Sequence, residues 1–582
     1  MPLRPAAAAL LLVLALPSAG TSQAARTRAA DSLAARVTAL ADEYVREFVA
    51  RFPERAEGNG LSVARHDGLS DNSLAAGRAW DARVDAWAAA AARMDGGALW
   101  GRPEWVTFGM LREALEAARG RRVCRQELWP VSQLAGWQAD FAELAGTQPV
   151  GTPELREQAL ARWRRVPRFL DTEVANLREG VRLGYTTPRR NVELVIGQLD
   201  ALLATPTEES PFYDPARRDS APEFRAAWRA LLETQLAPAV RRYRDYLRDE
   251  YRAAAREAAG VSANPDGAAC YRALFRGNTT LDRAPEETAE LGRARVARNR
   301  AEAEALGREA YGTGDLSAVL ARIRADSSTR FGSRDELLAF SRDAVARGRA
   351  AAPRWFRTLP RAEVEIQPHP AFLEQSAADQ YSPAAVDGSR PAVYRINLYR
   401  PEQKPRAVAE VTAFHETYPG HHLQIGLAQE LPGAHDLASL VFSGAFVEGW
   451  ARYSEALAEE MGLYTVPGAR ITRRIWPARG MVVDPGIHVM GWTREQAVRY
   501  IMEAGRGREE AESMVDRIAV LPGQLTAYDT GGLEIFALRE RAERELGAKF
   551  DVRDFHDAVL GRGAVTLPML REAVDRWIAS RK

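Results

Sequence analysis

The sequence predicts a mainly α-helical protein with a small β-sheet, on three observations. Long stretches of its 582 residues are rich in Ala, Arg, Glu and Leu, which favour helices. Proline stands at or near the start of several stretches, where a helix tolerates it best. Segments 333–336 and 493–496 have the Ser/Thr-x-x-Glu/Gln form of a capping box. The clearest predicted helices are Ser32–Val49, Pro153–Glu179, Pro222–Ala258 and Pro285–Tyr311.

The N-terminal segment is typical of a secretory signal peptide. Arg4 precedes an apolar run from Ala6 to Leu16, and Pro17 and small residues follow as far as Ala25, with a plausible cleavage site after Ala24. The run is too short to span a membrane, and no cysteine near the expected cleavage site could carry a lipid. We therefore expect residues 1–24 to be removed and the protein to be exported, to the periplasm or the medium, without a stable membrane anchor.

The rest of the chain divides into two predicted halves. The segment 262–267, which contains Pro, Gly and Asp, is the best candidate boundary between an N-terminal helical half, 25–265, and a C-terminal catalytic half, 266–582. We expect the two halves to form one body. The two cysteines, Cys124 and Cys270, could form a disulfide in an oxidising compartment, although the sequence does not show that they meet.

Two β-strands are predicted before the middle of the C-terminal half, at Val364–Gln367 and Val393–Tyr399. If the second is an edge strand beside a cleft, it could pair with an extended peptide, with Asn397 and Tyr399 on one face. An ordinary strand inside a small sheet explains the same residues equally well.

Three of the eight histidines lie in the segment His415-Glu416-Thr417-Tyr418-Pro419-Gly420-His421-His422. Imidazole is a common zinc ligand, and a neighbouring carboxylate can serve as base for metal-activated water. In a regular helix, His421 and His422 would lie about 9–10.5 Å beyond His415 along the axis, too far to share one ion. Pro419 and Gly420 offer a solution, because together they can break the helix.

A break at this point could fold His421 back towards His415. We favour His421 over His422 because the Gly-His order repeats the ending of several zincin motifs. The alternative is a helix that simply stops at Pro-Gly, with histidines capping it. Glu448, on a predicted helix that starts near Phe446, is the candidate third ligand, although it could instead pair with Arg452 one turn further on.

Four sequence blocks follow one another in the second part of the chain: HETYPGHHLQ, FVEGWARYSE, VVDPGIHVMGWTREQAVRY and RIAVLPGQLTAYDTGG. Together, and in this order, they resemble a bacterial family known as domain of unknown function 885, regarded as gluzincin-like zinc peptidases. The resemblance implies a large helical gluzincin-like fold with a deep cleft. It also implies zinc held by His415, His421 and Glu448, with Glu416 as general base.

Three further residues are candidates for substrate contacts. His488, in a predicted loop between Gly486 and Gly491, and Tyr528 could each donate a hydrogen bond to the oxyanion that forms during hydrolysis. Arg517 could bind a substrate carboxylate through its bidentate fork. Structural roles in packing or surface ion pairs explain each of the three as well.

These observations predict a secreted zinc-dependent peptidase that binds one Zn²⁺ and cleaves short peptides, through a zinc-bound water activated by a glutamate. A zinc hydrolase of another small amide or ester, or a non-catalytic exported protein that binds metal or peptides, remains an alternative. The formal net charge is +1, with both signs interspersed, so we expect no nucleic-acid partner.

Overall fold

The structure, a computed structural model, describes residues 19–369, 374, 378–384, 390–441 and 443–582. Helices make up most of it and three short strands form one sheet, which confirms the predicted mainly α fold. Residues 1–18 of the expected signal peptide lie outside the described residues. Within the described part, no helix combines the length and the apolar character needed to cross a membrane.

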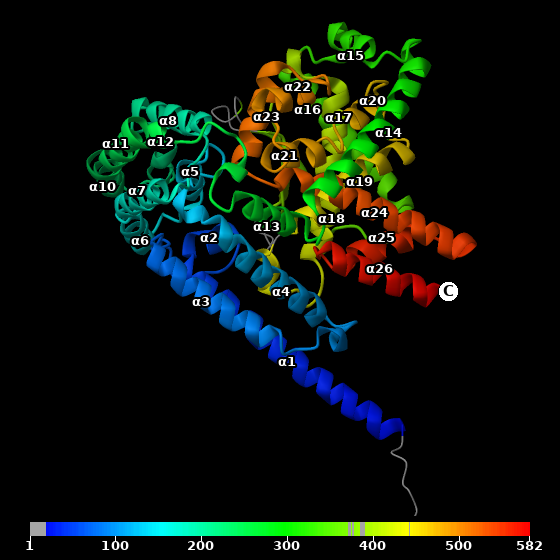
Figure 1. Ribbon diagram of the computed structural model, residues 1–582, viewed down its shortest axis with the longest axis horizontal. Coiled ribbons are helices and arrows are strands. Elements are labelled where there is room, and N and C mark those ends of the chain that lie inside the picture. Colours follow the sequence, from blue (N-terminus) through cyan, green and yellow to red (C-terminus); the bar gives the residue numbers. More distant parts are fainter. Residues whose placement is uncertain (1–18, 370–373, 375–377, 385–389, 442) are drawn as a thin grey trace, which may run out of the picture.

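The N-terminal half forms two groups of helices (Figure 1). The first group consists of α1 (Ala19–Arg51), α2 (Pro53–Gly58), α3 (Leu74–Ala91) and α4 (Pro103–Arg121). Helices α1, α3 and α4 pack around Trp87, Trp105 and Leu111, and α2 packs against Phe48 of α1 through Ala56. The second group packs around Trp163 and Trp228. Its members are α5 (Trp137–Thr147), α6 (Pro153–Trp163), α7 (Val166–Leu183), α8 (Arg189–Ala204), α9 (Asp214–Arg217), α10 (Pro222–Leu231), α11 (Ala237–Tyr246) and α12 (Arg252–Ala254).

The C-terminal half contains the largest hydrophobic core and all candidate site residues (Figure 1). Its first helices are α13 (Gly267–Thr279), α14 (Pro285–Tyr311), α15 (Leu316–Ala325) and α16 (Arg334–Ala351). After the sheet follow α17 (Arg406–Glu416), α18 (His421–Gln429), α19 (Gly444–Glu460), α20 (Ala469–Ile475), α21 (Gly480–His488), α22 (Arg494–Met502), α23 (Arg508–Val520), α24 (Gln524–Leu546), α25 (Val552–Leu560) and α26 (Leu567–Arg581).

The predicted helices agree with these elements to different degrees. The segment Pro285–Tyr311 is α14 as predicted. The predicted helix Pro153–Glu179 is divided into α6 and α7, and Pro222–Ala258 becomes α10 to α12, joined by two turns of π-helix. The capping box at Thr493 is confirmed, because the Thr493 and Gln496 side chains each bond the other residue's backbone N–H at the start of α22.

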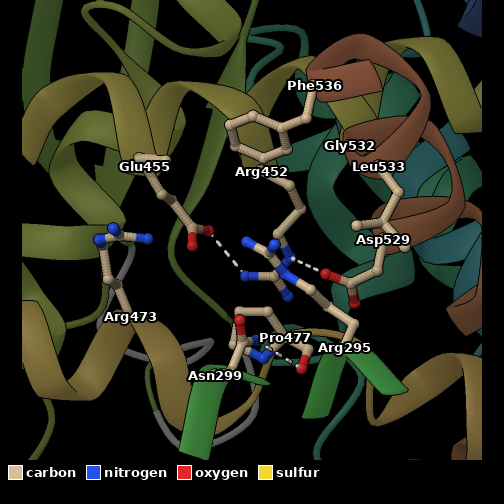
Figure 2. Close-up of a pocket in the computed structure, with 11 residues that line it drawn as sticks. Arg295, Asn299, Arg452, Glu455, Arg473, Pro477, Asp529, Gly532, Leu533 and Phe536 are labelled. Carbon is tan, nitrogen blue, oxygen red and sulfur yellow. Dashed lines mark hydrogen bonds and ion pairs between the residues drawn. The ribbon is translucent and has the colours of Figure 1, made fainter. Parts of the chain in front are cut away.

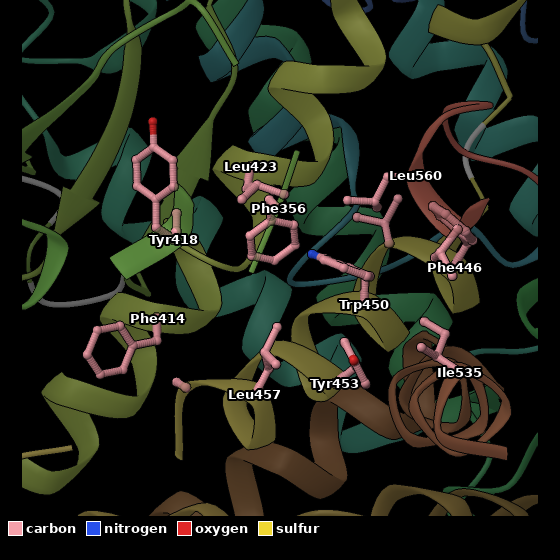
Figure 3. Close-up of a cluster of buried hydrophobic side chains, with 14 of the residues drawn as sticks. Phe356, Phe414, Tyr418, Leu423, Phe446, Trp450, Tyr453, Leu457, Ile535 and Leu560 are labelled. Carbon is pink, nitrogen blue, oxygen red and sulfur yellow. The ribbon is translucent and has the colours of Figure 1, made fainter. Parts of the chain in front are cut away.

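Helices α19 and α24 form the centre of the C-terminal half, and they cross at two glycines. A Cβ atom on Gly449 would lie 2.4 Å from the backbone of Gly531, and one on Gly531 would lie 1.6 Å from the carbonyl oxygen of Ala445. The glycines therefore allow the two backbones to touch. Figure 3 shows the apolar side of the same region, where Trp450 of α19 lies among buried aromatic and aliphatic side chains.

The sheet has the strand order β1-β3-β2, with β1 (Val364–Pro368) parallel and β2 (Gln380–Ser382) antiparallel to β3 (Ala392–Ile396). The first predicted strand is confirmed, and the second ends earlier than predicted, at Ile396. The hypothesis that this second strand is an edge strand is wrong, because β3 is the central strand. The edge strand β2 has only three residues, too few for a period-two pattern to be recognised in the sequence.

The two cysteines meet, although 146 positions separate them in the sequence. Cys124 follows α4, Cys270 lies on α13, and their sulfur atoms are bonded at 2.20 Å. Buried side chains from both predicted halves surround the bridge, among them Trp129 and Tyr271. The disulfide and this shared cluster therefore join the segments on the two sides of the predicted boundary at 262–267.

Replacing Cys124 and Cys270 together with serine is expected to lower the free energy of unfolding by about 2–5 kcal/mol, because the bridge closes a long loop of the unfolded chain. Denaturant unfolding of the wild type and the double variant measures the loss. Thiol reduction of the wild type should reproduce it, and an unchanged midpoint in the variant would contradict a stabilising role for the bridge.

Candidate metal centre

The chain breaks sharply between α17 and α18, at the position where the sequence places Pro419 and Gly420. Helix α17 ends at Glu416, the peptide bond between Tyr418 and Pro419 is cis, and α18 begins at His421. Gly420 lies directly on the end of α17, because a Cβ atom there would come within 1.9 Å of the His415 carbonyl oxygen. Only glycine permits this approach. The break brings His421 back beside His415, as the sequence predicted.

Three side chains converge at this break. The rings of His415 and His421 have centroids 4.8 Å apart and are nearly perpendicular. The Glu448 Oε2 atom, contributed by α19, lies 3.7 Å from His415 Nε2 and 3.5 Å from His421 Nε2. One ligand atom from each of the three residues lies within 4.8 Å of the others. The structure thus groups the three predicted metal ligands.

The two separations from Glu448 to the imidazoles are compatible with a tetrahedral zinc site. With zinc–ligand bonds of about 2.0–2.1 Å, neighbouring ligand atoms are expected about 3.3–3.5 Å apart. The separations of 3.7 Å and 3.5 Å from Glu448 to the two imidazoles are close to this value. Two imidazoles and one carboxylate also leave a fourth position for water or substrate, which is the usual composition of a catalytic zinc site.

The His415 ring is oriented by a second carboxylate on α19. Its Nδ1 donates to Glu455 Oε1 at 2.8 Å, so that Nε2 points to Glu448. Glu455 also accepts a hydrogen bond of 2.7 Å from Arg452 Nη1. Burial opposes a charged imidazole, but the carboxylates of Glu448 and Glu455 raise the pKa of His415 to about 10. Such a carboxylate behind a ligand histidine fixes the ring orientation in many zinc sites.

Glu455→Gln is expected to weaken zinc binding about 10- to 100-fold, because the amide cannot hold the His415 ring as the carboxylate does. Competition with a chelator of known affinity measures the change. Glu460→Gln is a matched control on the same helix, since its carboxylate pairs with Arg539 at 2.8 Å. Equal zinc affinity in the Glu455 variant and the control would rule out the orienting role.

Glu416 lies beside the cluster formed by His415, His421 and Glu448, and it contacts the edge strand β2 of the sheet. Its side chain is buried, and Oε2 accepts a hydrogen bond of 2.8 Å from the backbone N–H of Tyr381 in β2. Burial raises the pKa of its carboxyl above the ordinary range. The Tyr381 N–H therefore points away from β3 and towards the cluster, which places the outer edge of β2 next to Glu416.

His422 is turned away from the cluster, which agrees with the preference for His421. Its ring nitrogens lie 3.2 Å and 3.1 Å from the hydroxyl groups of Tyr381 and Tyr418. The side chain is fully buried, and burial lowers its pKa to about 4. His422 is therefore a neutral side chain that supports Tyr381, the residue that contacts Glu416.

The alternative in which Glu448 pairs with Arg452 is not what the structure shows. Arg452 instead lies between Glu455 and Asp529, and its Nε is 3.7 Å from Asp529 Oδ1. Figure 2 shows the Arg452 guanidinium between these two carboxylates, with Arg295 alongside, in a small pocket. This ion-pair arrangement leaves Glu448 to face the two imidazoles.

A cavity of about 310 Å³ opens beside the cluster and includes two further predicted site residues. His415 and Glu416 form part of its wall, together with Tyr528 of α24 and Arg517 of α23. The Tyr528 hydroxyl lies 3.5 Å from Arg517 Nη2 and 3.3 Å from Gln524 Nε2. Burial, and then the nearby charge of Glu448, raise the pKa of Tyr528, so the hydroxyl keeps its proton at neutral pH.

His488 does not reach this cavity, and the prediction that it lies in a loop is wrong. It is the last residue of α21 and is fully buried. Its Nδ1 accepts from the Val261 N–H and its Nε2 donates to the Ile518 carbonyl, both at 3.0 Å. Burial lowers its pKa to about 3. With both nitrogens engaged, the ring cannot donate to an oxyanion, and its position is structural.

Asn397 and Tyr399 also lie apart from the cavity wall. They follow the end of β3. The Asn397 N–H donates to Asp379 Oδ1 at 2.6 Å, and the Tyr399 N–H donates to Asn397 Oδ1 at 2.8 Å. Asn397 Nδ2 donates to the Glu374 carbonyl at 2.5 Å. Neither residue is part of the cavity wall, and β2, not β3, is the strand whose edge lies beside Glu416, so the prediction that these two side chains line the substrate cleft is corrected.

The sequence contained a usable signal for one of the residues that were not predicted. Glu455 lies two helical turns after Glu448 on α19, so both carboxylates share one face and can approach the same histidine. No comparable signal marks Tyr381. It contributes through its backbone N–H, and any residue of β2 would have one.

Comparison with known proteins identifies the family of the chain but no activity. No curated protein sequence matches it. A solved structure described as a "putative lipoprotein" from Colwellia psychrerythraea has 24% identity and a TM-score of 0.86, over 94% of this chain and 99% of that chain. A "putative lipoprotein of unknown function" from Shewanella oneidensis has 18% identity and a TM-score of 0.74, over 92% and 98%. At these identities, the likeness shows that the fold is shared.

The family model described as "Bacterial protein of unknown function (DUF885)" matches residues 53–574. The matched region includes the break at Pro419 and Gly420, the three grouped side chains and the cavity. Since the match covers most of the sequence, the chain belongs to the DUF885 family.

Proposed function

We propose that this protein is an exported, gluzincin-like zinc peptidase that hydrolyses short peptides. The observation that carries the proposal is the convergence of His415, His421 and Glu448 beside a cavity whose wall includes His415 and Glu416. Their separations suit one zinc ion, and the cavity lies within the range of small-ligand sites.

Each side chain has a role that follows from its position. A zinc ion, when bound, polarises the peptide carbonyl and makes water easier to deprotonate. Glu416 takes the proton from the attacking water and passes it to the leaving amine. Because the Tyr381 N–H holds Oε2 of Glu416, the second oxygen, Oε1, remains to accept that proton. The Tyr528 hydroxyl, which keeps its own proton, stabilises the oxyanion.

The edge strand β2 offers a way to hold an extended substrate. In a strand, the N–H and C=O of one residue point to the same side. The Tyr381 N–H points to Glu416, so its carbonyl also faces the site and can accept from a substrate N–H. A peptide aligned with β2 would place its backbone next to the metal ligands.

Export is supported by the disulfide between Cys124 and Cys270, because such bridges persist in oxidising compartments. The described residues also include no helix suited to crossing a membrane. The structures from Colwellia and Shewanella share this fold, and each is described as a "putative lipoprotein", a class of exported protein.

A library of short peptides, incubated with zinc-loaded and with chelator-treated protein, tests the proposal. We expect cleavage by the zinc-loaded protein, loss of cleavage after chelation, and recovery when zinc is returned. If zinc-loaded protein cleaves no peptide, the peptidase proposal is wrong. If the protein cleaves other small amides or esters but no peptide, it is a zinc hydrolase of a different substrate class.

A further inference from the structure

The cavity beside the metal cluster is lined by four arginines, and their partners differ. Three of them already have a carboxylate partner: Arg452 pairs with Glu455, Arg473 with Glu459, and Arg506 with Glu510. Arg506 is also stacked over the Trp476 ring, 4.5 Å from its centre. Each of these three residues thus has a carboxylate partner within the protein, although Arg473 shares Glu459 with Arg470 and Arg474.

Arg517 differs from these three. Its Nη2 donates to Gln524 Oε1 at 2.8 Å and lies 3.5 Å from the Tyr528 hydroxyl, and both groups are uncharged. In the part of the chain that the structure describes, no acidic side chain forms an ion pair with Arg517. The acidic groups of the same wall are engaged elsewhere: Glu455 and Asp529 with Arg452, and Glu416 with the Tyr381 N–H.

A partly buried arginine that has no carboxylate partner within the protein favours the binding of an anion from a ligand. The planar guanidinium binds carboxylates through two parallel hydrogen bonds, and only Nη2 of Arg517 is used by the protein. The Tyr528 hydroxyl connects the two parts of the site, since it lies beside Arg517 and close enough to Glu448 to feel its charge. An anion on Arg517 would therefore lie a short distance from the metal ligands.

From this arrangement we infer that the substrate carries a free carboxylate close to the bond that is cut, and that Arg517 binds this carboxylate. The inference rests on the proposed peptidase function and makes it more specific. A C-terminal carboxylate one or two residues beyond the scissile bond would make the enzyme act at peptide ends. An acidic side chain offers the same chemistry, and the experiment separates the two sources.

Binding is measured by calorimetry on zinc-loaded Glu416→Gln, in which hydrolysis is removed. The probes are trialanine, trialanine amide, and the amides of Ala-Glu-Ala and Ala-Gln-Ala. We expect trialanine to bind about 10- to 100-fold more tightly than its amide, and Arg517→Gln to remove this difference. A preference for Ala-Glu-Ala amide over Ala-Gln-Ala amide, lost in the same variant, would identify an acidic side chain as the source.

Two variants make the test specific. Arg506→Gln is the matched control, because its charge is already balanced by Glu510 and the preference for the free acid should remain. Arg517→Lys keeps the charge without the planar fork and should keep part of the preference. Equal affinity for acid and amide peptides in the parent protein, or no measurable binding of any probe, overturns the inference.

Hydrolysis by the protein with Glu416 intact separates this inference from the proposed function. If Arg517 acts only by positioning Tyr528, Arg517→Gln lowers cleavage of acid and amide peptides by the same factor, and the carboxylate site is wrong. If trialanine binds through Arg517 but zinc-loaded protein cleaves no peptide, the carboxylate site is retained and the peptidase proposal is the one that fails.

Discussion

Glu416→Gln is expected to reduce peptide hydrolysis by about 10²- to 10⁴-fold while leaving the zinc content unchanged. The amide keeps the size of the side chain and an oxygen that can accept the Tyr381 N–H, but it cannot take a proton from water. The proposed metal ligands are His415, His421 and Glu448, so the substitution removes none of them. The measurements are the steady-state rate on a cleaved library peptide and zinc per chain by elemental mass spectrometry.

The matched control for this substitution is Glu430→Gln. Its carboxylate accepts from the backbone N–H of Arg361 at 2.6 Å and is not part of the cavity wall, so the same loss of charge should leave hydrolysis unchanged. If Glu416→Gln cleaves peptides at the wild-type rate, Glu416 is not the general base. If it loses both zinc and hydrolysis, its carboxylate serves the metal site rather than the water.

The grouping of His415, His421 and Glu448 could be predicted from the sequence because its strongest constraints are local. Pro419 cannot continue the hydrogen bonding of α17, and Gly420 can lie on the end of that helix without a side chain to clash. These two residues made a fold-back of His421 physically reasonable. The sequence near Glu448 could not show whether Glu448 is a metal ligand or the partner of Arg452. Arg452 lies close to Asp529 of α24, a residue far away in the sequence.

The incorrect predictions have a common physical cause. The two hydrogen-bond partners of His488, Val261 and Ile518, come from distant segments, and nothing near His488 in the sequence indicates them. The position of β3 in the sheet depends in the same way on pairing with β1 and β2. Periodicity identifies a strand, but only its neighbours decide whether it is central or at the edge.

His421→Ala is expected to reduce bound zinc from about one ion per chain to near zero, whereas His422→Ala should retain it. His421 Nε2 lies 3.5 Å from Glu448, but both ring nitrogens of His422 face tyrosine hydroxyls. His422→Ala should still reduce hydrolysis, because it removes the support of Tyr381, whose N–H holds Glu416.

Elemental mass spectrometry on the two variants and the wild type, purified in parallel, separates two meanings of the break at Pro419 and Gly420. If the break forms a metal site, the His421→Ala protein lacks zinc and the His422→Ala protein retains it, although the two substituted positions are adjacent in the sequence. If the break only ends α17, both variants hold the same amount of zinc as the wild type. If the wild type binds no zinc even when zinc is supplied, the peptidase proposal loses its basis. If His422→Ala alone loses zinc, His422 rather than His421 binds the ion, and the convergence of His415, His421 and Glu448 is not the metal site.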